Sequence, residues 1–103
     1  MTKRPAVPRL SPKEAVILEL LVHNREMYGL ELVAASRKRL KRGTVYVTLG
    51  RMEEKGFIES RVEPAPSGDG GLPRRMYAAT AFGRRVLVAW TELARQLVAE
   101  FAR

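Results

Sequence analysis

The chain has 103 residues, a length typical of one domain, and its 46% hydrophobic and 29% charged residues indicate a folded globular protein. Nineteen lysines and arginines against 11 acidic residues give a formal net charge of +8, which favours a polyanionic partner, either nucleic acid or an anionic membrane surface. The lack of cysteine excludes disulfides, a thiolate nucleophile and cysteine-based metal sites.

Residues 1–10 contain two prolines and the basic residues Lys3, Arg4 and Arg9, and we expect them to form a flexible basic arm. No apolar run long enough for a signal peptide follows this segment. The apolar stretch 15–22 is too short to cross a bilayer and contains Glu19. We therefore expect a cytoplasmic protein that does not enter a membrane.

The first helix is predicted over residues 12–23. Ser11 can cap it, a proline follows in the first helical position, and Glu14 stands where a capping-box carboxylate bonds back to the cap. After a short connection over 24–28, a second helix is predicted over 29–39. Its inward-facing residues are expected to be Leu30, Val33 and Ala34, with Leu40 closing the turn.

A third, short helix is predicted over 44–55, with Thr44 as its N-cap and Gly56 as the residue that ends it. Helical spacing puts Val45, Leu49 and Met52 on its apolar face. The side chains expected to point away from that face are Tyr46, Thr48 and Arg51.

Two strands should follow, over 57–64 and 74–79, with Ile58 and Val62 on one face of the first. Between them, residues 65–73 are so rich in glycine and proline that we expect a mobile loop. The strands and loop therefore form a β-hairpin with a long tip.

Thr80 is predicted to cap a fourth helix over 81–102. The order helix, helix, helix, strand, strand, helix predicts a mainly α-helical chain with a small β-hairpin, an α+β arrangement. We expect a winged helix-turn-helix over 11–80, followed by a long C-terminal dimerisation helix over 81–103.

A basic cluster lies between the second and third predicted helices, and it places five cations in six positions: Arg37, Lys38, Arg39, Lys41 and Arg42. Cations neutralise phosphates and release counterions, while a narrow helix with polar outward side chains fits the DNA major groove. Charge runs are usually solvated surface, but this one adjoins the helix best suited to a groove. The cluster therefore favours duplex DNA as the partner.

Five recognisable segments follow one another along the chain: residues 27–32 (MYGLEL), 42–46 (RGTVY), 49–58 (LGRMEEKGFI), 72–77 (LPRRMY) and 80–83 (TAFG). In this order they resemble the PadR family of transcriptional regulators. The chain departs from the family pattern at Gly50 and in its glycine-rich wing tip, and it matches the subgroup with a single C-terminal helix. The resemblance implies a winged-helix repressor that binds an operator with dyad symmetry.

The resemblance places Tyr28, Thr44 and Tyr46 near the DNA backbone, where hydroxyls bond phosphates; partial core packing is the alternative for both tyrosines. Thr48 and Arg51 are candidates for contacts with base edges, although a salt bridge to Glu54 is an alternative for Arg51. Alternation along the second strand should turn either Arg74 or Arg75 toward DNA. The complete predicted DNA-binding set is Tyr28, Lys41, Arg42, Thr44, Tyr46, Thr48, Arg51, Arg74 and Arg75.

The last helix carries an apolar stripe too long for a three-helix head to cover, so we expect a homodimer. The predicted dimerisation residues are Val86, Trp90, Leu93, Leu97 and Phe101. Trp90 is either a packing residue at this seam or a platform for a small aromatic effector, to which some regulators of the resembled family respond.

Nothing in the sequence predicts an enzyme, a cofactor or a bound metal, and His23, the only histidine, is expected to cap the end of the first helix. Two alternatives to a DNA-binding regulator remain open. One is a winged-helix protein-interaction module with only nonspecific DNA affinity. The other, less favoured by the mixed charges of the last helix, is a peripheral membrane protein.

Overall fold

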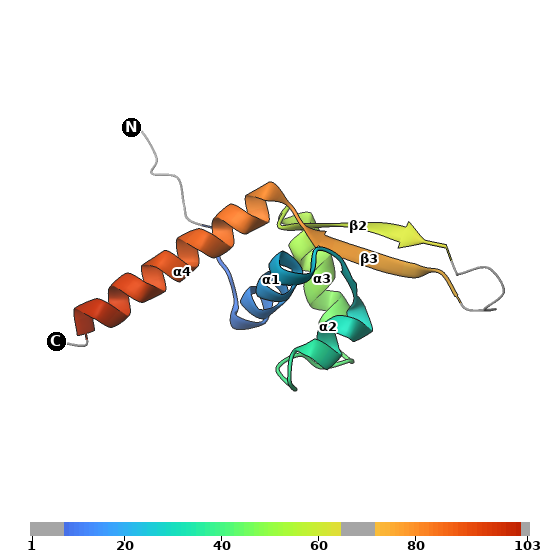
Figure 1. Cartoon of the computed structure of the whole chain (residues 1–103), viewed down its shortest axis with the longest axis horizontal. Coiled ribbons are helices and arrows are strands. Elements are labelled where there is room, and N and C mark those ends of the chain that lie inside the picture. Colours follow the sequence, from blue (N-terminus) through green and yellow to red (C-terminus); the bar gives the residue numbers. More distant parts are fainter. Residues whose placement is uncertain (1–7, 65–71, 102–103) are drawn as a thin grey trace.

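A computed structural model describes residues 8–64 and 72–101, which form four helices and a three-stranded sheet (Figure 1). The first seven residues of the predicted arm, residues 65–71 of the predicted wing loop and the last two residues lie outside the described part. A head of three short helices is flanked on one side by the hairpin of strands β2 (Ile58–Glu63) and β3 (Arg74–Ala79), while the long helix α4 (Ala81–Phe101) leaves the head on the other side.

Helix α1 (Pro12–Asn24) begins as predicted. The amide N of Glu14 donates to Ser11 Oγ at 3.2 Å, and the Ser11 amide donates back to Glu14 Oε1 at 2.8 Å. This reciprocal capping box satisfies two amides that the first helical turn leaves without partners. At the other end, the ring of His23 lies 3.0 Å from the Glu19 carbonyl oxygen.

Helix α2 (Gly29–Ala35) is shorter than predicted, because the chain turns sharply after Ser36. Arg37 and Lys38 both have positive φ angles, 53° and 70°, and cannot continue a helix. The predicted inward face is wrong at Leu30 and Ala34, which are exposed, whereas Val33 packs against the core as predicted. Leu32 is the fully buried residue of this helix.

Helix α3 (Val45–Glu54) confirms the third predicted helix, and Val45, Leu49 and Met52 form its buried face. Gly56 has a φ of 79° and ends it as expected. Thr44 occupies the N-cap position, but its side chain makes no capping hydrogen bond, so that part of the prediction is wrong.

The sheet contains the two predicted strands, β2 (Ile58–Glu63) and β3 (Arg74–Ala79), and an unpredicted third, β1 (Met27–Tyr28). All pairings are antiparallel and the order is β1-β3-β2, with β1 residues opposite Tyr77 and Met76. Ile58 is buried, whereas Val62 on the same strand face is exposed because the hairpin extends past the head.

One hydrophobic core fills the space between α1, α3 and the sheet. Its fully buried side chains include Ile17, Leu18, Leu21, Leu32, Leu49, Met52 and Phe57. Val86 of α4 also belongs to this core and is only 4% exposed. The prediction that assigned Val86 to a dimer face is therefore wrong, because its side chain is buried within its own protomer.

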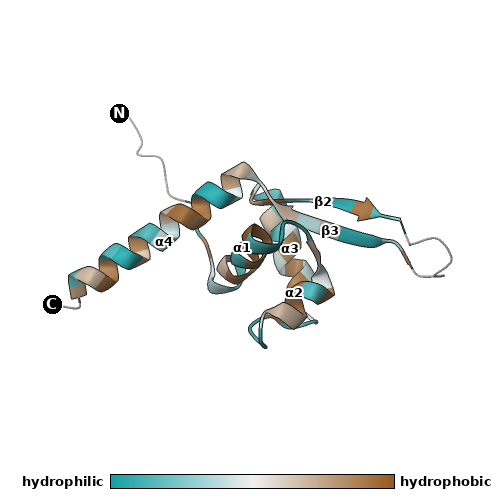
Figure 2. Ribbon diagram, in the orientation of Figure 1, coloured by the Kyte–Doolittle hydropathy of each residue, from teal (hydrophilic) through white to brown (hydrophobic). Residues whose placement is uncertain are grey.

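Thr80 caps helix α4 (Ala81–Phe101). Its Oγ1 accepts from the Gly83 amide at 2.9 Å and donates to the Gly56 carbonyl at 2.6 Å. The predicted cap thus also ties α4 to the end of α3. From Thr91 onward every described residue of α4 is exposed. Hydrophobic and hydrophilic bands alternate along this projecting part (Figure 2).

Candidate nucleic-acid interface

The surface of α3 that points away from the core is open to solvent. Its buried residues fix the helix in the head, and the opposite side exposes Tyr46 (51%), Val47 (57%) and Arg51. Thr48 is half-buried, and its hydroxyl lies 3.3 Å from the Thr44 carbonyl. The described residues form no ion pair with Arg51, so the alternative salt bridge to Glu54 is not present.

The basic cluster, residues 37–42, forms an exposed turn directly before α3. Buried Ser36 builds the turn: its Oγ donates to the Val33 carbonyl at 2.7 Å and accepts from the Leu40 amide at 3.0 Å. Leu40 is buried beneath the turn, as predicted. The five cations of the cluster, including Lys41 and Arg42, are all exposed at the entry to α3.

Two predicted tyrosines, Tyr28 and Tyr46, lie beside Gly29 at the start of α2. A Cβ at Gly29 would lie 2.6 Å from ring atoms of Tyr46, so only glycine lets the ring pack this closely. Tyr28 directly precedes Gly29, and the guanidinium of Arg74 lies 4.7 Å from the centre of the Tyr28 ring. This cation–π distance joins the base of the hairpin to the start of α2.

The two wing arginines point to opposite faces of the hairpin, as the alternation predicts. Arg74 stacks on Tyr28, whereas Arg75 donates from Nη1 to Ser60 Oγ at 3.0 Å. Ser60 in turn donates to Glu53 at 3.0 Å, which connects Arg75 to the end of α3. Both arginines remain exposed.

A groove of about 400 Å³ runs along the other side of α3, between this helix and the start of α1. Its walls come from two segments, 9–14 and 44–55, which contribute Arg9, Ser11, Lys13, Glu14, Thr44, Val47, Thr48, Arg51 and Lys55. Three predicted residues, Thr44, Thr48 and Arg51, therefore meet in one groove. Arg9, Lys13 and Lys55 also belong to this site, although no pattern in the sequence predicted them.

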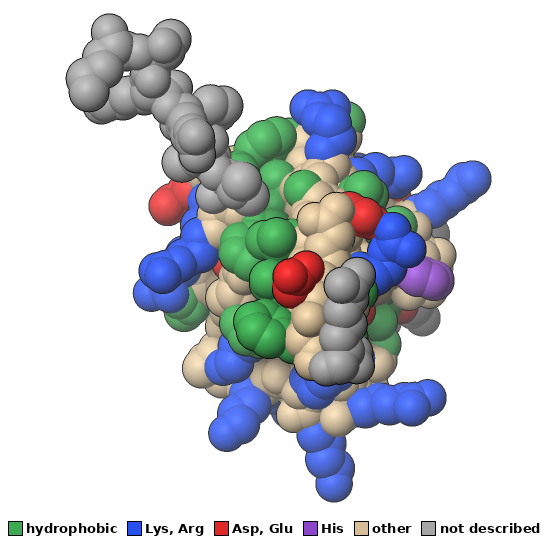
Figure 3. Space-filling view, turned by 90° about the vertical axis from the view of Figure 1, so that its left-hand side faces the viewer, with side chains coloured by type: hydrophobic (Ala, Val, Ile, Leu, Met, Phe, Trp, Pro, Cys, Tyr) green, Lys and Arg blue, Asp and Glu red, His purple; other side chains and the backbone are tan. Residues whose placement is uncertain are grey.

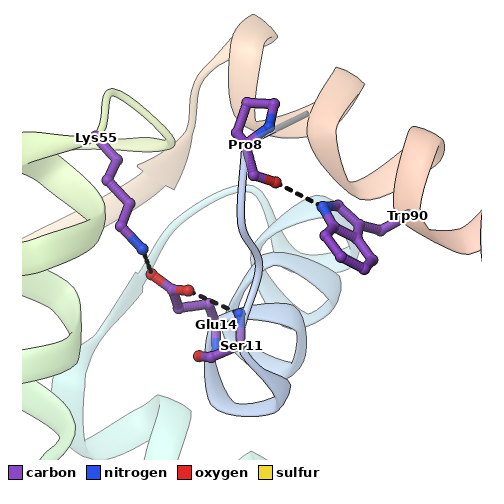
Figure 4. Close-up of polar contacts among 5 residues, drawn as sticks. All are labelled: Pro8, Ser11, Glu14, Lys55 and Trp90. Atoms are coloured by element: carbon purple, nitrogen blue, oxygen red, sulfur yellow. Dashed lines mark hydrogen bonds and ion pairs between the residues drawn. The ribbon is translucent and has the colours of Figure 1, made fainter. Parts of the chain in front are cut away.

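An ion pair between α1 and the end of α3 closes one wall of the groove (Figure 4). Lys55 Nζ lies 2.7 Å from Oε2 of Glu14, whose other carboxylate oxygen accepts from the Ser11 amide. Burial by itself raises the pKa of Glu14, but the hydrogen bonds and positive charge of Lys55 and the bonds from Ser11 outweigh it, so the pKa lies below its usual value. Glu14 is therefore ionised at neutral pH.

None of the helices in the described ranges combines the length and the apolar character that a membrane crossing requires.

A three-helix head, an exposed third helix behind a basic turn, and a β-hairpin beside it define a winged helix-turn-helix protein. The model of the transcriptional regulator PadR-like family matches residues 17–89. The chain therefore belongs to the PadR-like family of transcriptional regulators.

Solved structures agree with this assignment. A PadR family transcription regulator from Clostridium difficile R20291 has 26% identity and a TM-score of 0.71, over 90% of this chain and all of that one. A second from Eggerthella lenta DSM 2243 has 25% identity and a TM-score of 0.70, over 85% of this chain and 76% of that one. Bacillus subtilis PadR in complex with operator DNA shares the fold at 20% identity and a TM-score of 0.65, over 86% of this chain and 58% of that one. A comparison with curated proteins finds no match.

Proposed function

We propose that this chain is a sequence-specific DNA-binding regulator, a repressor that binds a dyad-symmetric operator as a homodimer. The observation that carries the proposal is the open face of α3, which has the basic turn 37–42 at its start and basic side chains along its flank. A helix of this size with outward polar groups fits the major groove of duplex DNA. The complex of Bacillus subtilis PadR with operator DNA supports a DNA partner for this fold.

In this proposal the predicted residues divide between positioning and sequence reading. Lys41 and Arg42 contact phosphates at the entry to α3, and hydroxyls of Thr44, Tyr28 and Tyr46 fix the register on the backbone. Arg51 and Thr48 reach base edges, because an arginine can bond both acceptors of a guanine. Because Arg74 and Arg75 lie on opposite faces of the hairpin, one of them contacts the adjacent minor groove or its phosphates and the other stays solvated.

The homodimer is proposed to form through α4. Residues 91–101 continue α4 for about 16 Å, and all of them are exposed, so packing within the protomer does little to stabilise this part of the helix. Leu93, Leu97 and Phe101 fall within an arc of roughly 80° on this segment and are all exposed. Hydrophobic side chains gather on one side of the molecule when it is viewed from this end, with Lys and Arg around the outline (Figure 3). A second copy would cover the stripe.

Trp90 is proposed as the contact for a small aromatic effector, with dimer packing as the competing role. The indole is half-buried and borders a hollow of about 260 Å³ between α1 and α4. A planar ligand stacked there that prefers a DNA-incompetent arrangement would release the operator by shifting populations. Calorimetric titration with planar aromatic compounds tests this role, because a seam residue would bind none of them. Operator release in the same samples links binding to regulation.

Selection from random duplex DNA tests the central proposal. We expect a recurring two-fold motif, bound with an affinity that falls about 10³- to 10⁵-fold between 50 and 200 mM salt if each dimer contacts ~6–10 phosphates. Binding without an enriched motif would instead indicate a protein-interaction module with nonspecific DNA affinity. A nearly flat salt response would contradict phosphate contacts altogether.

A further inference from the structure

The groove between the start of α1 and α3 is strongly basic and borders the proposed reading helix. At about 100° per residue, Thr48 and Arg51 point to the side of α3 away from Tyr46. The groove is lined by four basic side chains, Arg9, Lys13, Arg51 and Lys55, and by one acidic side chain. That acid, Glu14, already pairs with Lys55, so its charge does not offset the other three cations. The groove therefore presents an excess of positive charge.

The segment that supplies Arg9 is held at both of its ends (Figure 4). On one side, Trp90 Nε1 donates to the carbonyl oxygen of Pro8 at 2.7 Å. On the other, the Ser11 amide donates to Glu14, which is fixed by Lys55. Arg9 lies between these two anchors, so its backbone is fixed while its exposed side chain lines the groove. A cation on a fixed backbone loses less conformational entropy when it binds an anion than one on a free arm.

We infer that the α1 side of this groove holds the sugar-phosphate backbone of duplex DNA, with Arg9 and Lys13 as phosphate contacts beyond those predicted from the sequence, while Thr48 and Arg51 on its α3 side face the bases. The inference rests on the proposed DNA-binding function and extends the contact surface past α3 to the start of α1. Phosphate oxygens match the lining, which combines cations with the hydroxyls of Ser11 and Thr44. Trp90 acts here as a positioning residue, because it touches Arg9's segment and not the DNA.

The test measures how DNA affinity depends on salt concentration for the wild type and two variants. Each protein is measured on the operator recovered by selection and on a random duplex. The double variant Arg9→Ala/Lys13→Ala should bind both duplexes more weakly, by about 3- to 10-fold for each phosphate that it no longer binds. The slope of log affinity against log salt should fall by about 0.9 for each of these phosphates. Arg84→Ala is the matched control, because it removes an exposed cation of α4 that does not line the groove, and its slope should equal that of the wild type.

A second measurement locates the contact. Neutral methylphosphonate linkages are placed one at a time along the operator backbone. The wild type should lose affinity at one position in each half-site beside the α3 contacts, and the double variant should be insensitive there. Trp90→Phe removes the indole donor but keeps an aromatic ring, so it should weaken DNA binding in the wild type and not in the Arg9→Ala background.

The outcomes separate the two proposals. A double variant with the wild-type slope and wild-type methylphosphonate pattern overturns the groove contact and leaves the DNA-binding function standing. A wild-type protein that binds no duplex with a steep salt dependence overturns both.

Discussion

Gly83 in the first turn of α4 packs directly against the backbone of Phe57, the residue that links α3 to the sheet. A Cβ at position 83 would overlap the carbonyl oxygen of Phe57 and lie 2.9 Å from its carbonyl carbon. The neighbouring Thr80 amide donates to that same carbonyl at 3.0 Å. This close approach sets the position of the long helix relative to the end of the reading helix.

Gly83→Ala should therefore destabilise the fold by about 1–3 kcal/mol, because backbone atoms cannot move aside as a side chain would. Gly50→Ala is the matched control: a Cβ there meets nothing within 4 Å, and alanine is favoured over glycine inside a helix. We expect Gly50→Ala to stabilise the chain by about 1 kcal/mol. Thermal or urea unfolding measures the stability of both variants. An equal loss of stability in the two would contradict the special role of the close contact between Gly83 and Phe57.

Glu14→Gln should lower the free energy of unfolding by about 1–2 kcal/mol at neutral pH, since it removes a charge-assisted bond to Lys55 and Lys55 remains partly exposed to screening water. The folded-state pKa of Glu14 lies below its ordinary value, so its contribution is fully present above about pH 4.5 and is lost as the pH falls through the folded-state pKa. The difference between wild type and variant should shrink on acidification. A constant difference from pH 7 to pH 3 would show that the ion pair contributes nothing.

Arg51→Ala and Lys41→Ala should weaken DNA binding in different ways. Loss of a base contact at Arg51 is expected to cost ~1–3 kcal/mol and to relax preference at one operator position in each half-site. Loss of Lys41, exposed in the basic turn, should weaken all sequences alike and reduce the salt slope. Binding to a panel of operator variants measures the distinction, and identical profiles for both mutants would refute it.

Leu97→Glu should convert the proposed homodimer to a monomer, because it places a charge in the apolar stripe of α4. Val88→Glu is its control: Val88 is also exposed and apolar but lies about 180° around the helix. Sedimentation analysis should give half the wild-type mass for Leu97→Glu alone. If the wild-type protein is itself monomeric at micromolar concentration, the role assigned to α4 is wrong.

Features encoded by neighbouring residues were predictable from the sequence. The Ser11–Glu14 capping box, the Thr80 cap and the positive φ of Gly56 each depend on residues a few positions apart, and all three are present. The family resemblance rests on short segments of consecutive residues, and it is confirmed by the match of the family model to residues 17–89.

Features that depend on distant contacts were missed. The two-residue strand β1 exists only because β3, some 50 residues later, pairs with it. The early end of α2 follows from the buried hydroxyl of Ser36, which bonds the Leu40 amide in place of a continued helix. The basic groove combines the segment of Arg9 and Lys13 with Lys55 at the end of α3, and no periodic pattern in the sequence connects the two.

The indole of Trp90 has a consequence for how the protein can be observed. It is the only tryptophan of the chain, and its ring N–H is bound to the Pro8 carbonyl. Release of the N-terminal segment from α4 would expose that N–H to water and shift the emission of the indole toward longer wavelength. The fluorescence of Trp90 in the unlabelled protein therefore indicates whether the segment bearing Arg9 is bound to α4, both in the free protein and as DNA is added.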